Sequence, residues 1–379
     1  MENSWSVPQS TVLSRTRELL MSDQAGVLVS VVDVEGSAYR RPGVKMLVPE
    51  DGRGIGSITA GCLEDEVVRL ANSVLEAGRP RLETFDLTND DDVWGLGIGC
   101  NGVIDLLVEP VDKRHEPLFD AHEAEQPIVS VTVLDSEASD VDAWQRTYFR
   151  PDGSPTADSK QVPPWLIDAI SERVTALTNE GQAGTVDVDG PNGSVRLFID
   201  SITPPPTFVT IGTGHDIGPV VDLANRNGFR TVLVGFRGAV VTEDRIAVAD
   251  ETVSTSPRNI REVVDFDEET YVVVMSHNFV DDRLVLDELV RTPVPYVGLM
   301  GPHKRFEEML SEFDSEGRTL SEVELAKVYT PVGLDLGSET PYQIAHSIVA
   351  EVLAVHNERT PRHLKDRVGS IHERTMDTT

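Results

Sequence analysis

This chain of 379 residues has almost no cysteine and very little lysine. Its two cysteines are not expected to form a structural disulfide, because thiols in a cytoplasm are kept reduced. Only six of the 33 basic residues are lysine, whereas 64 residues are acidic, so the net charge is −31. A field of that sign repels nucleic acid and anionic lipid, and it argues against a nucleic-acid-binding protein.

The excess of carboxylates over lysines also has a physiological interpretation. Such a composition is typical of halophilic proteins, whose acidic surface keeps them soluble in a salt-loaded cytoplasm. The alternative is an acidic face that binds a basic partner.

Long apolar runs are absent as well. The longest, residues 271–275 and 294–300, fall far short of the roughly 20 residues that a membrane-spanning helix needs. The first residues lack the basic segment and apolar core of a secretory signal. We therefore expect no membrane span and a cytoplasmic location.

With 39% hydrophobic and 26% charged residues, the chain has the composition of a globular protein. At 379 residues it is too long for a single hydrophobic core. The stiff run Pro204-Pro205-Pro206 is a natural spacer, so we predict a domain over residues 1–203 and another over 207–358. Residues 359–379 form a polar tail.

The first domain is predicted to be mixed α+β. Hydrophobic spacing and turn residues place helices at 11–21, 63–77 and 164–177, and strands at 26–32, 44–48, 55–58, 81–87, 103–108, 128–134, 147–150, 185–188 and 194–199. Asp51-Gly52 is suited to a hairpin between the strands at 44–48 and 55–58. Residues 90–102 are predicted to be a loop.

The second domain alternates apolar strands with amphipathic helices, which is typical of a Rossmann-like parallel sheet covered on both faces. The predicted strands are 207–211, 231–234, 271–275 and 296–299, and the predicted helices are 215–225, 283–290 and 341–355. The fold class is therefore α/β, with a mixed α+β N-terminal domain before a Rossmann-like C-terminal domain.

A glycine loop follows the first strand of that second domain. Gly212, Gly214 and Gly218 stand between a strand and a helix, where backbone amides bind phosphate. The spacing departs from the dinucleotide fingerprint, since the third glycine is one place late. The second strand ends at Gly235, where a carboxylate for a ribose hydroxyl is expected. These departures favour a site that binds a phosphate-bearing ligand other than NAD. The alternative is a glycine turn that only lets the helix and the strand pack closely.

Three histidines, His215, His277 and His303, follow the predicted strands of the second domain. The ends of parallel strands line the ligand crevice of such sheets, so these side chains are candidates for phosphate binding, acid/base chemistry or metal binding. The alternative is three solvated or packing residues, and no close-spaced motif indicates zinc. No acid/base pair or nucleophile triad is present, so we assign no enzymatic mechanism.

Both cysteines, Cys62 and Cys100, have glycine neighbours, which leave a thiol uncrowded and accessible to a soft metal or a sulfur-containing partner. Cys62 also stands at the start of a predicted helix, which favours a thiolate, whereas the acidic run Glu64-Asp65-Glu66 disfavours a second negative charge. The alternative is a pair of small buried hydrophobic residues.

Together these motifs resemble the XdhC/CoxI family of molybdenum-enzyme maturation factors. The resemblance lies in Glu35-Gly36-Ser37, Arg40-Arg41-Pro42-Gly43, Gly56-Ser57, Gly61-Cys62-Leu63-Glu64, Gly95-Leu96-Gly97 through Cys100 and Gly102, Gly212-Thr213-Gly214-His215, Ser276-His277, Tyr296-Val297-Gly298, Pro331 to Gly337 and Glu339-Thr340-Pro341. Two positions depart from the family pattern: Gly235 replaces an aspartate, and Pro302-His303-Lys304-Arg305 replaces a serine and arginine run.

The resemblance implies a chaperone that binds molybdenum cofactor (molybdopterin), assists its sulfuration with a sulfurtransferase, and delivers it to an apo-enzyme of the xanthine dehydrogenase or CO dehydrogenase type. A homodimer and a non-catalytic maturation factor are expected. The implied cofactor-binding residues are Arg40, Arg41, Gly61, Cys62, Glu64, Cys100, Gly212, Gly214, His215 and His277, with Cys62 and Cys100 as metal contacts. The alternatives are an NAD(P)-binding oxidoreductase, suggested by the Rossmann loop alone, and a scaffold that binds only proteins.

Overall fold

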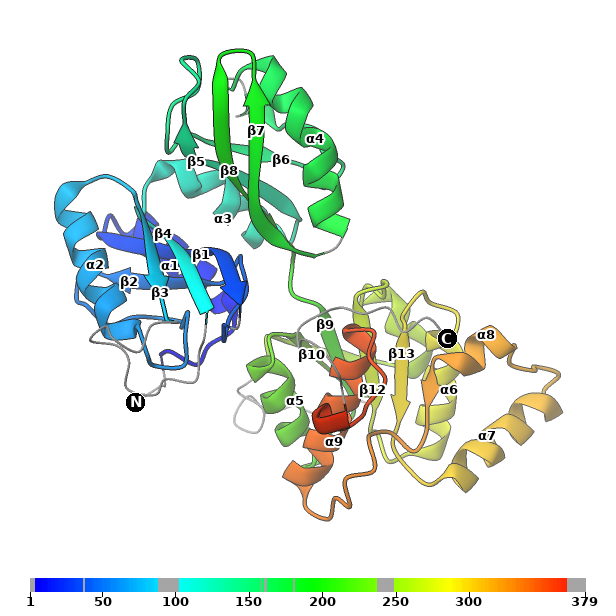
Figure 1. The fold of residues 1–379 in the computed structure, drawn as a ribbon. Coiled ribbons are helices and arrows are strands. Elements are labelled where there is room, and N and C mark those ends of the chain that lie inside the picture. Colours follow the sequence, from blue (N-terminus) through cyan, green and yellow to red (C-terminus); the bar gives the residue numbers. More distant parts are fainter. Residues whose placement is uncertain are drawn as a thin grey trace. The chain divides into compact units, whose positions relative to one another are not determined.

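The computed structural model describes residues 4–36, 38–87, 102–157, 159, 162–179, 181–236 and 249–366. It divides into two compact units, Met1–Pro204 and Pro205–Thr379 (Figure 1). Among the described residues, no helix has both the length and the apolar content needed to cross a bilayer. Cys100, almost all of the predicted loop at 90–102, and the last part of the polar tail lie outside the described residues.

One antiparallel sheet of the first unit has the strand order β2-β1-β4-β3. Its strands are β1 (Gly26–Gly36), β2 (Lys45–Pro49), β3 (Arg81–Asp86) and β4 (Gly102–Pro110). Successive side chains of a strand point to opposite faces. Val29 accordingly packs in the core under α2 (Glu64–Ala77), while Leu28 packs against α1 (Gln9–Met21).

The other sheet of the first unit has the order β6-β5-β8-β7. It consists of β5 (Ile128–Ser136), β6 (Arg146–Phe149), β7 (Ala183–Gly190) and β8 (Gly193–Ile202), and it is covered by α4 (Pro164–Asn179). A short helix, α3 (Glu116–Glu123), packs its buried Phe119 near α1. Apolar side chains of both sheets, among them Leu107 and Phe198, share one small core.

The second unit contains a six-stranded parallel sheet with the order β11-β10-β9-β12-β13-β14 (Figure 1). Its strands are β9 (Thr207–Ile211), β10 (Arg230–Phe236), β11 (Glu251–Thr255), β12 (Thr270–Val274), β13 (Tyr296–Leu299) and β14 (Val328–Tyr329). Numbered within the unit, this is the order 3-2-1-4-5-6 of a Rossmann sheet, which reverses direction between β9 and β12. The predicted fold class is confirmed.

Helices cover both faces of this sheet. Phe208 of β9 packs in the core under α5 (Ile217–Arg226) and α9 (Pro341–His356), and the next residue, Val209, packs on the side of α6 (Phe279–Leu289) and α7 (His303–Ser315). A short helix, α8 (Glu322–Ala326), precedes β14. The sheet is therefore buried on both sides, as its nearly continuous apolar strands require.

Candidate cofactor-binding sites

The glycine turn of the second unit lies at the point where the strand order reverses. Gly212 follows β9 with φ +151°, and a Cβ there would lie 2.4 Å from the carbonyl oxygen of Met275. Only glycine lets the ends of β9 and β12 approach so closely. After the turn, α5 begins at Ile217, and no side chain caps its N-terminus. Pro219, the third residue of α5, has no N–H, so the first-turn donors available for an anion are those of Ile217 and Gly218.

His277 lies on the other side of this reversal point, just beyond the end of β12. Its Nε2 is 2.8 Å from Oδ2 of Asp216, the residue that precedes α5. His277 holds a backbone φ of +57°, which is uncommon for a residue other than glycine. Both side chains are solvent-accessible, so this hydrogen bond contributes little stability and mainly orients the imidazole beside the turn.

The other two candidate histidines have no hydrogen bond or ion pair with this pair among the described residues. His215 is exposed within the turn, and His303 begins α7, where its Nε2 lies 3.7 Å from Glu307 of the same helix. The contacts of the described residues bring His277 to Asp216 but bring none of the three histidines together. Within this part of the chain, no three His, Cys, Asp or Glu side chains are arranged to hold a metal ion.

A buried ionic group behind β12 was not predicted from the sequence. Ser276 Oγ and Arg305 Nη2 both donate hydrogen bonds to the carboxylate of Asp282, which is 1% exposed. Burial raises the pKa of Asp282 in spite of these two donors. The guanidinium of Arg305 also lies over the ring of Phe279. This group holds the backbone that follows β12. In the sequence, only the motif Ser276-His277 pointed to it.

In the first unit, Arg40 is held beside the loop that carries Cys62. Its Nη2 donates to Oγ of the buried Ser57 at 3.3 Å, and its guanidinium lies 5.6 Å from the ring centroid of Tyr39. Its Nε is buried and has no hydrogen-bond partner among the described residues. A buried donor without an acceptor is costly, which makes this guanidinium a candidate for an anionic ligand.

Glu64 organises the cysteine loop from within. Its carboxylate accepts hydrogen bonds from Thr59 N at 2.9 Å, Thr59 Oγ1 at 2.5 Å and Leu63 N at 3.2 Å. Thr59 Oγ1 in turn accepts one from Cys62 N. Gly61 has φ +105°, and a Cβ there would meet nothing within 4 Å, so the loop is open on that side. Glu64 therefore positions the loop that carries the half-buried Cys62.

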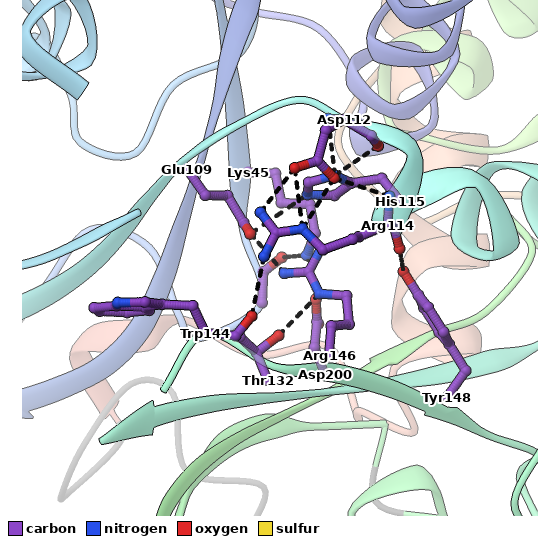
Figure 2. Close-up of polar contacts among 11 residues, drawn as sticks. Lys45, Glu109, Asp112, Arg114, His115, Thr132, Trp144, Arg146, Tyr148 and Asp200 are labelled. Atoms are coloured by element: carbon purple, nitrogen blue, oxygen red, sulfur yellow. Dashed lines mark hydrogen bonds and ion pairs between the residues drawn. The ribbon is translucent and has the colours of Figure 1, made fainter. Parts of the chain in front are cut away.

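A buried polar cluster lies between the two sheets of the first unit (Figure 2). Lys45 of β2 pairs with Asp200 of β8, and its Nζ also donates to the carbonyl of Gly43 at 2.8 Å. Glu109 of β4 pairs with Arg146 of β6 at 2.6 Å. These contacts tie the segment after Arg40 to both sheets.

The charges in this cluster compensate one another. Burial alone would raise the pKa of Glu109, but Arg146 and His115 lower it to about 2. Burial likewise raises the pKa of Tyr148 to about 12, and its hydroxyl donates to the carbonyl of Arg114 at 2.7 Å. Neither Glu109 nor Tyr148 titrates near neutral pH, so we interpret the cluster as structural: it holds the two sheets of the first unit together.

The remaining predicted site residues are Arg41, Gly214 and Cys100, and of these Gly214 lies against the His277–Asp216 pair. Arg41 is half-buried beside Arg40, and only its backbone carbonyl has a hydrogen bond among the described residues. Gly214 lies in the turn before α5, where a Cβ would meet the carboxylate of Asp216 at 2.3 Å. Cys100 lies outside the described residues.

Comparison with known proteins agrees with this architecture. Residues 208–352 match the family model described as the XdhC Rossmann domain, and residues 19–86 match that of the XdhC and CoxI family. A structure described as a xanthine dehydrogenase from Bacillus halodurans has a TM-score of 0.72 and 26% identity, covering 93% of this chain and 97% of that one.

Two curated proteins are also similar in sequence. Over 340 residues the chain is 28% identical to a protein of Bacillus subtilis (strain 168) named as a probable xanthine dehydrogenase subunit, covering 88% of this chain and 94% of that protein. It is 39% identical over 110 residues to the molybdenum cofactor insertion chaperone PaoD of Escherichia coli (strain K12), covering 29% of this chain and 33% of that protein.

Proposed function

The chain belongs to the XdhC and CoxI family, and from this premise we propose that it binds molybdenum cofactor and serves the maturation of a xanthine dehydrogenase-type enzyme. The names of two relatives support the proposal: one is a probable subunit of xanthine dehydrogenase, and the other is a molybdenum cofactor insertion chaperone.

The observation that carries the proposal is the phosphate-type site of the second unit. The uncapped N-terminus of α5 follows the Gly212 turn, and His277 stands beside it at the reversal point. Molybdopterin bears a phosphate, which suits backbone N–H groups at a helix N-terminus. We assign Gly212, Gly214, His215 and His277 to this contact.

The donor set of the first unit also fits the cofactor. Arg40 has a buried Nε without a partner among the described residues, and Cys62 is half-buried in a loop that is open at Gly61. When bound, the cofactor supplies molybdenum and its dithiolene sulfurs, and a cysteine sulfur is the kind of soft ligand that suits such a metal. In this proposal Arg40 and Arg41 bind anionic groups, Cys62 and Cys100 face the metal, and Glu64 holds the loop.

The proposal also covers the oligomeric state, the cellular location and the protein partners. We propose that a homodimer acts in the cytoplasm, receives sulfur for the cofactor from a sulfurtransferase, and delivers the cofactor to an apo-enzyme of the xanthine dehydrogenase or CO dehydrogenase type. These assignments rest on the family, and pull-down of the apo-enzyme and the sulfurtransferase with the purified chain tests them.

Retention of the cofactor by the purified protein tests the binding site. Cofactor released from a molybdenum enzyme is mixed with the chain, and bound pterin is measured after anaerobic gel filtration. We expect Cys62→Ser and Arg40→Gln to retain less pterin than the wild type. The matched control Arg53→Gln changes an exposed arginine that is not among the assigned residues and should retain the wild-type amount. Equal retention by all variants would contradict the proposed site.

An NAD(P)-dependent oxidoreductase is the second candidate, and the Rossmann strand order favours it. Against it, β10 ends at Gly235-Phe236, without the carboxylate that binds a ribose hydroxyl. Calorimetric titration with NAD and NADP decides between the two: heat at micromolar concentrations would support the oxidoreductase, and a flat titration would remove it.

A further inference from the structure

The first unit contains a cavity of about 570 Å³ that lies away from the Cys62 loop. The end of α2, the start of β3, and residues of β5 and β8 surround it. The side chains that matter here are those of Arg79, Arg81, Leu82, Asp135, Trp144 and Arg196. The volume lies within the usual range of small-ligand pockets, roughly 300 to 1,000 Å³.

Three arginines line this cavity in a chain whose net charge is −31. Arg79 forms no ion pair with any described residue, and Arg81 pairs only with the neighbouring Glu83. The guanidinium of Arg196 is shared between two carboxylates, each 3.4 Å away, so neither contact is a close one. Guanidinium groups that are not fully paired are suited to bind a phosphate bidentately.

Trp144 forms an aromatic wall of the cavity and is held there at a conformational cost. Its φ is +67°, a left-handed value that bulky residues rarely adopt. The strain is held by two hydrogen bonds: Trp144 N donates to Val133 O at 2.8 Å, and Arg114 Nη1 donates to Trp144 O at 3.1 Å. Strain of this kind recurs at ligand clamps.

The ring of Trp144 points away from the polar cluster (Figure 2). No described residue accepts a hydrogen bond from its indole Nε1, which leaves that donor for a ligand. Asp135 adds an exposed carboxylate, directly opposite Arg196 in the β5–β8 ladder. The cavity thus combines a stacking surface, guanidinium donors and one acceptor for N–H groups.

We propose that this cavity binds a phosphate-bearing heteroaromatic compound whose ring edge carries N–H donors, as in a guanine nucleotide or a pterin phosphate. The ring stacks on Trp144, its N–H edge faces Asp135, and its phosphate lies on Arg79 and Arg81. Stacking on an aromatic side chain stabilises a bound base, because every base has a π-face. The site uses none of the residues assigned to the molybdenum cofactor, so either assignment can fail without the other.

Calorimetric titration of the full chain with guanosine monophosphate tests the proposal. Guanosine measures the contribution of the phosphate, and adenosine monophosphate measures that of the ring edge. The phosphate ester of 6-hydroxymethylpterin distinguishes a pterin source from a nucleotide source. We expect a phosphate-bearing ring to bind, and the tighter of the two esters identifies the source.

Variants locate the binding. Arg79→Gln and Trp144→Asn should each weaken binding roughly tenfold, since each removes about 1.4 kcal/mol or more. Asparagine tolerates the left-handed backbone at 144, and Trp144→Phe, which keeps a ring, should bind nearly as well as the wild type. Arg53→Gln, at an exposed position, is the control that should leave binding unchanged.

Two results would overturn the proposal. One is no binding of any phosphate-bearing ring at millimolar concentration by folded protein. The other is binding that survives both Arg79→Gln and Trp144→Asn, because the ligand would then occupy another site.

Discussion

His277 Nε2 lies 2.8 Å from Asp216 Oδ2, although the two residues are 61 positions apart in the chain. One follows β12 and the other precedes α5, so their contact spans the point at which the parallel sheet reverses its order. Ligands of open α/β sheets bind at such points. The pair therefore lies where a sheet of this kind is expected to bind its ligand.

The glycine turn can be tested by adding a single methyl group. Gly212→Ala places a Cβ 2.4 Å from the carbonyl of Met275 at a φ of +151°, so we expect a loss of about 3 kcal/mol in unfolding free energy. Gly218→Ala is the matched control, because its Cβ meets nothing within 4 Å; it should be neutral or stabilising by roughly 0.5 kcal/mol. Urea denaturation measures both. Equal effects would contradict the geometry of the turn.

The hydrogen bonds of Glu64 to the cysteine loop can be tested apart from the effect of a negative charge in the first turn of α2. Glu64 and Glu66 both lie in the first turn of α2, but only Glu64 binds the cysteine loop. Glu64→Ala should cost about 2–3 kcal/mol, since it removes hydrogen bonds to a charged group. Glu66→Ala removes only an exposed ion pair with Arg69 and should cost about 0.5 kcal/mol. Hydrogen exchange at Thr59 and Leu63 should accelerate only in the first variant. Slow exchange in both would show that the loop does not depend on Glu64.

The buried pair Glu109–Arg146 predicts a dependence of stability on pH. The pKa of Glu109 falls from 4.5 to about 2 on folding, so its stabilising contribution is complete above pH 4.5 and is lost as the pH decreases toward 2. Glu109→Gln leaves Arg146 buried without its partner and should cost about 3–5 kcal/mol at pH 7. The difference from the wild type should narrow below pH 4.5.

Denaturant unfolding from pH 7 to pH 3 measures this narrowing. The control Glu76→Gln, at an exposed position of α2, should stay within about 0.5 kcal/mol of the wild type at every pH. A constant difference between Glu109→Gln and the wild type would mean that the carboxylate is not the ionised partner of Arg146.

The net charge of −31 predicts a strong effect of salt. Raising potassium chloride from 0.1 M to 1 M shortens the screening length from about 10 Å to about 3 Å, which weakens the repulsion among carboxylates. The melting temperature should therefore rise with salt. Sucrose at matched osmolality is the control, because an uncharged solute is excluded from the protein surface but does not screen charges. A melting temperature that falls or stays constant with salt would argue against the halophilic interpretation.

Much of the fold was predictable because its signals are local. The alternation of apolar strands and amphipathic helices after Pro206 predicted the parallel sheet, and the strands predicted at 185–188 and 194–199 correspond to β7 and β8. The strand predicted at 55–58 is reduced to a single bridge between Leu47 and Ile55, because β2 pairs mainly with β1. Pairing with a distant strand cannot be seen in a local pattern.

Helix boundaries show the same limit. The helix predicted from 283 begins at Phe279, because Asn278 Oδ1 accepts hydrogen bonds from Val280 N and Asp281 N and caps it. In β11, exposed and half-buried positions alternate, and only its parallel pairing with β10 identifies it as a strand. Helices α3 and α7 were not predicted either.

The site was predictable by residue type but not by contact. The sequence pointed to Arg40, Cys62, Gly212 and His277, but it did not show that Ser57 holds Arg40 or that Asp216 holds His277. Those contacts join segments that are distant in the chain, so only the folded structure reveals them. The cavity at Trp144 was missed for the same reason, since α2, β3, β5 and β8 form it together.

Binding of molybdenum cofactor is the central claim, and elemental and pterin analysis of the protein itself tests it most directly. The chain is produced in a host that makes the cofactor and is supplied with molybdate, and it is purified without oxygen. We predict that molybdenum and a fluorescent pterin oxidation product co-purify in equal amounts, and that Cys62→Ser carries less of both. Protein that contains neither, and that takes up neither from supplied cofactor, would contradict the account.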